Sequence, residues 1–166
     1  MRNTDIVVLG LGSNRPYGAL NPHELVLSAA RDLGGLLGGM RLSPLYRTAP
    51  QQVKDQAAFI NAACRGFWDG TPEALLEAAG MIEARYGRNR GAERRWGERS
   101  MDIDILLFGG RVINTPLLQI PHPRLAERRF ALQPLLDLLP RASDPESGVP
   151  YRSMLDAVSG QHIERV

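Results

Sequence analysis

The sequence MDIDILLF, which runs from Met101 to Phe108, decides how this chain is interpreted. Side chains alternate between the two faces of a β-strand. Asp102 and Asp104 therefore project side by side from one face, while the isoleucines beside them project from the other and can join a core. Aspartate is depleted in strands, so two of them in one short strand call for a reason.

The segments around this strand predict the remaining elements. Asn21 followed by Pro22, and Thr71 followed by Pro72, are typical of helix starts. Strands are expected at residues 5–11, 40–48, 58–68 and 101–108, with a return strand at 111–114 after a glycine turn. Helices are expected at residues 23–37, from Thr71 to about residue 86, over parts of 125–139 where Pro134 breaks the helix, and at 151–158.

This order predicts an α+β protein with a ferredoxin-like β-α-β-β-α-β core. We expect a mostly antiparallel sheet with helices packed on it, plus C-terminal additions. With 166 residues, 43% of them hydrophobic, the chain is expected to form a single domain over residues 1–166. These values exclude disordered and collagen-like classes.

Charge and cysteine content narrow the possible functions. The net charge is only +2, which is too small for a protein that binds nucleic acids through bulk charge. Cys64 is the single cysteine, so the chain has no intrachain disulfide and no cysteine-rich zinc site. The apolar segments are too short for a membrane span. We therefore expect a cytoplasmic protein, without a nucleic-acid or membrane partner.

Arginines gather just before the paired aspartates. Of the 20 basic residues only Lys54 is a lysine, a bias that a GC-rich coding sequence also explains. Six arginines precede the strand closely: Arg85, Arg88, Arg90, Arg94, Arg95 and Arg99. Carboxylates that hold Mg²⁺ beside arginines that neutralise phosphate charge are what polyphosphate transfer needs. The alternative is an exposed charged loop followed by two solvated aspartates.

Residues 95–109, RWGERSMDIDILLFG, resemble the signature R-W-G-P-R-x-L-D-L-D-I-L-L-F-G of 6-hydroxymethyl-7,8-dihydropterin pyrophosphokinases. Glu98 stands where the family commonly has proline. The resemblance extends over essentially the whole chain. Further matching segments are Gly12-Ser13-Asn14, Tyr46-Arg47-Thr48, residues 59–63, residues 112–115, Pro121-His122-Pro123 and Arg128-Arg129-Phe130.

The resemblance implies that pyrophosphate passes from ATP to the hydroxymethyl group of the pterin, that AMP is released, and that two Mg²⁺ ions take part. By resemblance, Asp102 and Asp104 are the metal ligands and act with Arg88 and Arg99 in catalysis. The implied ATP-binding residues are Leu76, Glu83, Trp96, Ile105, His122 and Arg128. The implied pterin-binding residues are Thr48, Phe59, Asn61 and Phe130. A monomer is expected because the site lies in the cleft of one domain.

Two other functions stay open at this point. An RNA-binding module on the same architecture would need an aromatic RNP motif, which the sequence lacks, and carboxylates on the sheet would repel phosphate. A noncatalytic pterin- or nucleotide-binding regulator would keep the fold without the activity. The two phenylalanines also have a simpler interpretation as core residues, and His122 as a structural hydrogen-bonding group. Residues 49–58 and 88–100 are expected to be mobile without ligands.

Overall fold

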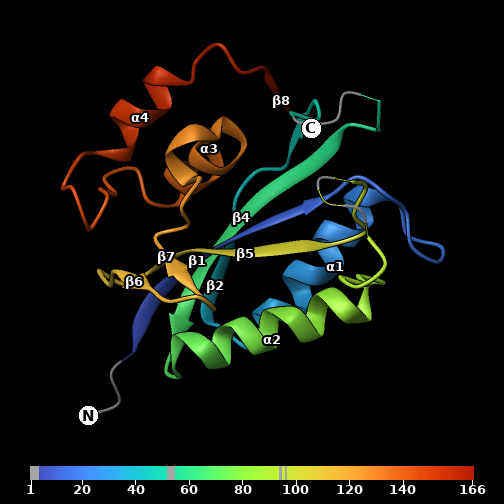
Figure 1. Cartoon of the computed structure of the whole chain (residues 1–166), viewed down its shortest axis with the longest axis horizontal. Helices are drawn as coiled ribbons and strands as arrows, with labels where there is room; N and C mark the ends of the chain where they lie inside the picture. Colours follow the sequence, from blue (N-terminus) through green and yellow to red (C-terminus); the bar gives the residue numbers. More distant parts are fainter. Residues whose placement is uncertain (1–3, 52–54, 94, 96) are drawn as a thin grey trace.

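Six strands form one antiparallel sheet with helices on both faces (Figure 1). The computed structural model describes residues 4–51, 55–93, 95 and 97–166. The elements are β1 (Asp5–Ser13), α1 (Pro22–Gly34), β2 (Gly38–Leu42), β3 (Tyr46–Thr48), β4 (Phe59–Trp68), α2 (Pro72–Arg85), β5 (Asp102–Phe108), β6 (Ile113–Asn114), β7 (Gln119–Ile120), a 3₁₀ turn (Leu125–Glu127), α3 (Arg129–Leu138), α4 (Tyr151–Ala157) and β8 (Ile163–Arg165).

The strand order across the sheet is β5-β1-β4-β3-β8, and β2 also pairs with β4. The long central pair is β1 with β4, in register from Asp5 opposite Trp68 to Ser13 opposite Ile60. All of these pairings are antiparallel. The expected antiparallel α+β architecture is therefore confirmed.

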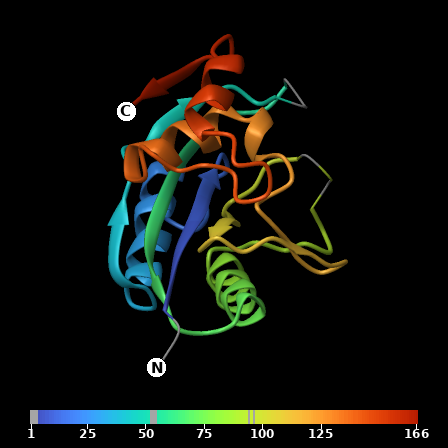
Figure 2. The same ribbon diagram turned by 90° about the vertical axis from the view of Figure 1, so that its left-hand side faces the viewer.

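Alternating side chains give the sheet a core on each face. On β1, Val7 and Leu9 pack with α1 and α2, whereas Val8 packs with α3 and α4. The view in Figure 2 shows the two helix pairs on opposite sides of the sheet. None of the described helices combines the length and apolar character needed to cross a membrane.

The two predicted helix starts are present. The Asn21 side chain accepts a hydrogen bond from the N–H of Glu24, and the Glu24 carboxylate accepts one from the N–H of Asn21. This reciprocal pair satisfies two N–H groups that the first turn leaves unpaired. The Thr71 side chain caps α2 in the same way by accepting from Ala74.

Two predictions are wrong, and the short strands β7 and β8 were not predicted. The expected return strand at residues 111–114 does not pair with β5. Its last two residues form β6, which pairs instead with β7, and this pairing goes with the burial of Ile120. Pro134 does not break its helix: it lies inside α3, where burial against the sheet outweighs one missing hydrogen bond. Strand β8 was missed because it is three residues long and mostly exposed.

Candidate active site

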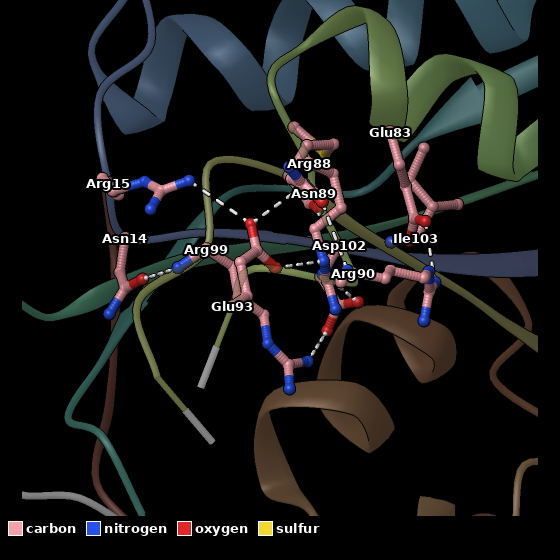
Figure 3. A network of polar contacts seen from close by, with 12 residues as sticks. Asn14, Arg15, Glu83, Arg88, Asn89, Arg90, Glu93, Arg99, Asp102 and Ile103 are labelled. Atoms are coloured by element: carbon pink, nitrogen blue, oxygen red, sulfur yellow. Dashed lines mark hydrogen bonds and ion pairs between the residues drawn. The ribbon is translucent and has the colours of Figure 1, made fainter. Parts of the chain in front are cut away.

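The two aspartates of β5 project from the sheet face that carries α3, as the alternation predicts. Between and beside them, Ile103 and Ile105 are 3% and 4% exposed and lie in the opposite core. The pleat therefore leaves both carboxylates on one surface. Figure 3 shows the polar network that surrounds Asp102.

Two arginines hold Asp102, one at each carboxylate oxygen. Arg88 Nη1 donates to Oδ1 at 2.8 Å, and Arg99 Nη1 donates to Oδ2 at 2.7 Å (Figure 3). Burial of Asp102 opposes ionisation, but the charges of Arg99 and Arg88 outweigh it and hold its pKa below the ordinary value. Asp102 is thus an ionised carboxylate that is held in place by two guanidinium groups, whose charges compensate its own.

Asp104 lies in a different environment although it is two residues away. Burial and then the charge of Asp102 raise the pKa of Asp104 to about 7. His122 Nε2 is 3.9 Å from Asp104 Oδ2. Burial and the charge of Arg128 lower the pKa of His122 to about 4, so this imidazole is neutral at pH 7. Among the described residues, Asp104 thus contacts a neutral imidazole, whereas Asp102 contacts two guanidinium groups.

The backbone after β7 explains why His122 comes so close. The N–H of His122 donates to the carbonyl of Leu106 at 3.1 Å, which docks the connector onto β5. Nδ1 of the imidazole accepts from the N–H of Arg124 at 3.1 Å. The proton of the neutral ring is consequently on Nε2, which faces Asp104.

A row of residues crosses the sheet beside the aspartates. Gly12 pairs with Asp102 on one side and with Asn61 on the other. Since neighbouring strands are about 4.8 Å apart, Asp102 and Asn61 lie about 10 Å apart across the sheet. A Cβ atom at Gly12 would be 2.9 Å from Oδ1 of Asn61, so glycine is required for this amide to keep its place. Asn61 Nδ2 also donates to Thr48 Oγ1 at 2.7 Å.

A cleft opens above this row. The aromatic rings of Phe59 and Phe130 both line it, and Arg128 lies over the Phe130 ring at 5.5 Å from its centre. The predicted site residues that line this cleft are Thr48, Phe59, Asn61, Arg99, Asp102, Asp104, His122, Arg128 and Phe130. Residues assigned separately to pterin, metal and phosphate thus share one cavity.

A second, more open pocket adjoins the first. It is lined by Leu76 and Ile105, both expected at the ATP site, and it shares Asp104 and His122 with the main cleft. The two hollows therefore meet at Asp104, a carboxylate that could hold a metal ion bound to a polyphosphate. An elongated ligand with an aromatic end can extend from one hollow to the other.

Two predicted residues, Glu83 and Arg88, line neither hollow. Glu83 is 1% exposed; its Oε1 accepts from the N–H of Ile103 at 2.8 Å and its Oε2 from Arg90 at 2.7 Å (Figure 3). Arg88 is buried behind the cleft wall, where it contacts Asp102. Trp96 lies outside the described residues.

The donor set of the cleft fits magnesium. Mg²⁺ prefers carboxylate oxygens and keeps several waters, so two aspartates are enough when phosphate oxygens complete the coordination. In the described part of the chain, no group of three or more His, Cys, Asp or Glu side chains could hold a metal by itself. A cation held by these two aspartates would offset the charge of Asp102 that helps to raise the pKa of Asp104.

Two residues with clear roles in the site were not predicted. Asn14 at the end of β1 accepts from the N–H of Arg99 at 2.8 Å and donates to Gln56 and to the carbonyl of Ala57. Glu93 lies between two arginines in the loop after α2 (Figure 3). Its position within a run of arginines was the available signal for Glu93.

Comparison with known proteins agrees with this geometry. Residues 8–140 match the family of 7,8-dihydro-6-hydroxymethylpterin-pyrophosphokinase (HPPK). The chain is 37% identical over 163 residues to the 2-amino-4-hydroxy-6-hydroxymethyldihydropteridine pyrophosphokinase of Pseudomonas aeruginosa, with 96% of each protein covered. It is 42% identical over 148 residues to a mitochondrial folate synthesis bifunctional protein of Arabidopsis thaliana.

The plant relative is much longer than this chain: the match covers 89% of the chain but 26% of the plant protein. Among solved structures, the Plasmodium falciparum HPPK-DHPS crystallised with pteroate superposes with a TM-score of 0.72 at 17% identity, over 95% of this chain and 43% of that one. That likeness establishes the fold. From the family match and the Pseudomonas relative together, the chain belongs to the 7,8-dihydro-6-hydroxymethylpterin-pyrophosphokinase family.

Proposed function

We propose that this chain transfers pyrophosphate from ATP to the hydroxymethyl group of 6-hydroxymethyl-7,8-dihydropterin, a step of folate biosynthesis. The hydroxymethyl oxygen bonds to the β-phosphorus, and the bond from that phosphorus to the oxygen of the α-phosphate breaks. AMP leaves with the electron pair of that bond. The hydroxyl proton passes to water, with Asp104 placed to assist.

One observation carries this proposal: the paired carboxylates and the aromatic pair open into the same cleft. Phe59 and Phe130 can stack on a flat pterin, and Asn61 offers an amide to its polar edge. Asp102 lies about 10 Å from Asn61 across a strand with no side chain at Gly12. This spacing suits a ring at one end and a reacting phosphate at the other.

The adjoining pocket supports ATP as the donor. Leu76 and Ile105 give it an apolar wall suited to a base, and it meets the main cleft at Asp104 and His122. His122 presents a neutral Nε2–H, a hydrogen-bond donor for a phosphate oxygen. Arg128, half-buried over Phe130, adds a cation on the pterin side of the same junction.

We propose Asp102 and Asp104 as the ligands of two Mg²⁺ ions. Bound there, the ions would supply positive charge to the phosphates and lower the pKa of the attacking hydroxyl. The chain itself keeps Asp102 ionised through Arg88 and Arg99. Arg99 lines the cleft and can turn toward a phosphate, whereas Arg88 stays buried behind the wall.

The direct test is AMP formation. The purified chain is mixed with ATP, Mg²⁺ and 6-hydroxymethyl-7,8-dihydropterin, and AMP and the pterin diphosphate are quantified by chromatography. We expect equal amounts of both products and no AMP when the pterin is omitted. Binding of both substrates by the folded protein without AMP would overturn the proposal and favour a noncatalytic regulator.

We also propose a broader description of the chain. We interpret the strand order β5-β1-β4-β3 as a ferredoxin-like core with C-terminal additions, and residues 1–166 as one domain, because both helix layers pack on one sheet. We infer a monomer because the cleft is built from one chain, with small-molecule partners and no nucleic acid or membrane. A free, buried Cys64 is consistent with the cytoplasm.

A further inference from the structure

Glu93 belongs to a row of alternating charges behind the cleft and lies next to Arg88, the central member of that row. Glu93 Oε1 is 3.3 Å from Nη2 of Arg15, and its Oε2 is 2.6 Å from Nε of Arg88 (Figure 3). Its side chain is only 8% exposed. Arg88 then contacts Asp102, and Asp102 contacts Arg99. Cations and anions thus alternate over five side chains from three segments.

Among the three arginines of this row of charges, Arg88 is the most constrained. Its side chain is 7% exposed, and its Nη1 donates both to Asp102 Oδ1 at 2.8 Å and to the carbonyl of Met101 at 3.1 Å. Glu93 contacts the same guanidinium from the Nε side. This N–H is not aligned for a hydrogen bond, so the contact is an ion pair. A planar guanidinium with anionic partners on two of its edges has a restricted orientation.

We propose that Glu93 is a positioning residue for the pyrophosphoryl transfer: it aims the Arg88 guanidinium at Asp102. The inference rests on the proposed function, since Asp102 is there a metal ligand. Glu93 touches neither hollow of the site and acts through Arg88. Its own backbone is fixed by a hydrogen bond from its N–H to the carbonyl of Asn89, so the carboxylate is presented by a built turn.

Removal of this carboxylate has a defined physical consequence. A buried guanidinium that loses one of two anionic partners is left undercompensated, and it moves toward the remaining anion or toward water. Either movement changes how strongly Asp102 is held, and therefore the environment of the proposed metal ligand. Partners that orient metal ligands from outside typically change metal affinity or activity about 10–100-fold when mutated.

Three variants separate this role from general effects of charge and loop structure. Glu93→Gln keeps the shape and removes the anion. Glu98→Gln makes the same charge change at an exposed position of the same loop. Arg15→Gln breaks the contact of Glu93 to the end of β1 but leaves its contact to Arg88.

The first readout uses ligand-free protein. The Nε–H of Arg88 is buried, so ¹⁵N NMR of the wild type should show a resolved Arg88 signal that exchanges slowly with water. Glu93→Gln should shift this signal and accelerate its exchange, and the two control variants should not. An unchanged Arg88 signal in Glu93→Gln would overturn the inference, whether or not the chain releases AMP.

The second readout uses the substrates. For Glu93→Gln, we expect the affinity for a non-hydrolysable ATP analogue with Mg²⁺, and kcat, to fall about 10–100-fold. The KM for the pterin should stay within about twofold, because in the described part of the chain the Glu93 side chain contacts Arg15, Arg88 and Asn89 and none of the proposed pterin-binding residues. Equal losses in Arg15→Gln or Glu98→Gln would assign the effect to the loop or to net charge, against our proposal. A wild type without AMP release rejects the proposed function separately.

Discussion

The carboxylate of Glu83 and the backbone N–H of Ile103 are joined by a hydrogen bond of 2.8 Å. This bond fastens the last turns of α2 to the residue between the two aspartates. Because Glu83 is 1% exposed, neither group has access to water that could replace the partner. The bond therefore fixes the backbone on which the two proposed metal ligands stand.

We expect Glu83→Ala to lower the free energy of unfolding by about 1–3 kcal/mol, because the N–H of Ile103 loses its acceptor in a buried place. Glu83→Gln keeps an oxygen for this N–H and should retain most of the stability, since its ion-pair partner Arg90 is largely exposed. Urea denaturation measures both, with Glu77→Ala on the same helix as the exposed control. Equal stability of the Ala and Gln variants would contradict the role of the hydrogen bond.

The same glutamate gives a pH dependence with a defined sign. Burial raises the pKa of Glu83 in the folded chain, so the folded state holds its proton more strongly than the unfolded state. The resulting stabilisation is present at low pH and is lost as pH rises through the folded pKa. Relative to Glu83→Gln, which does not titrate, the wild type should therefore lose stability as the pH rises over the range above about 4.3, the ordinary pKa of glutamate. Parallel urea midpoints over this range would refute the raised pKa.

Asp102→Ala and Asp104→Ala should each reduce turnover by at least about 100-fold, because each removes a proposed ligand of the ions that neutralise the phosphates. Circular dichroism should show that both variants keep the fold. Asp156→Ala, at an exposed position of α4, is the matched control. Near-normal turnover in either cleft variant would rule out the metal-ligand role.

The aromatic pair is expected to affect the pterin more than the nucleotide. Phe59→Leu and Phe130→Leu keep an apolar side chain and remove the flat face, so each should raise the KM for the pterin about 2- to 10-fold, corresponding to about 0.5–1.5 kcal/mol. The KM for ATP should change less. Phe67→Leu, an exposed phenylalanine at the far end of β4, controls for the substitution itself. Equal effects on both KM values would argue that the pair is core.

Asn14 joins two loops, so its removal should loosen both. Its amide contacts Gln56 and Ala57 in one loop and the N–H of Arg99 in the other. For Asn14→Ala, amide hydrogen exchange should become faster in both residues 55–58 and residues 97–100. Asn89→Ala breaks a single contact within the second loop and should affect that loop alone. Faster exchange in only one loop of Asn14→Ala would show that the contacts are independent.

Much of the fold and the carboxylate pair could be predicted because local patterns determine them. Strand alternation placed Asp102 and Asp104 on one face, and capping residues located two helix starts. The partner of β6 was predicted wrongly. β6 pairs with β7, whose Ile120 is buried, and this pairing is determined by tertiary packing and not by the local sequence. The same holds for Pro134: the free-energy cost of its missing helical hydrogen bond is offset by packing against residues that are distant in the sequence.

Within the candidate site, residue types were predictable and partnerships were not. The sequence shows a cluster of arginines but does not reveal that Arg88 turns inward while Arg99 lines the cleft. Glu93 was not predicted as a site residue for the same reason: its contacts with Arg15 and Arg88 form only in the folded protein. The assignment of Glu83 to the nucleotide likewise stays a prediction, because the structure places it behind β5.

The depth of the cleft comes in part from side chains that β1 does not have. Gly10 and Gly12 form its floor between the aspartates and Asn61, and any larger residue at position 12 would collide with the Asn61 amide. An inhibitor that fills this depth would therefore face a constrained route to resistance. A substitution at position 12 that excludes the inhibitor would also displace the Asn61 amide, which we propose binds the pterin, so resistance and loss of fitness would arise from the same added carbon.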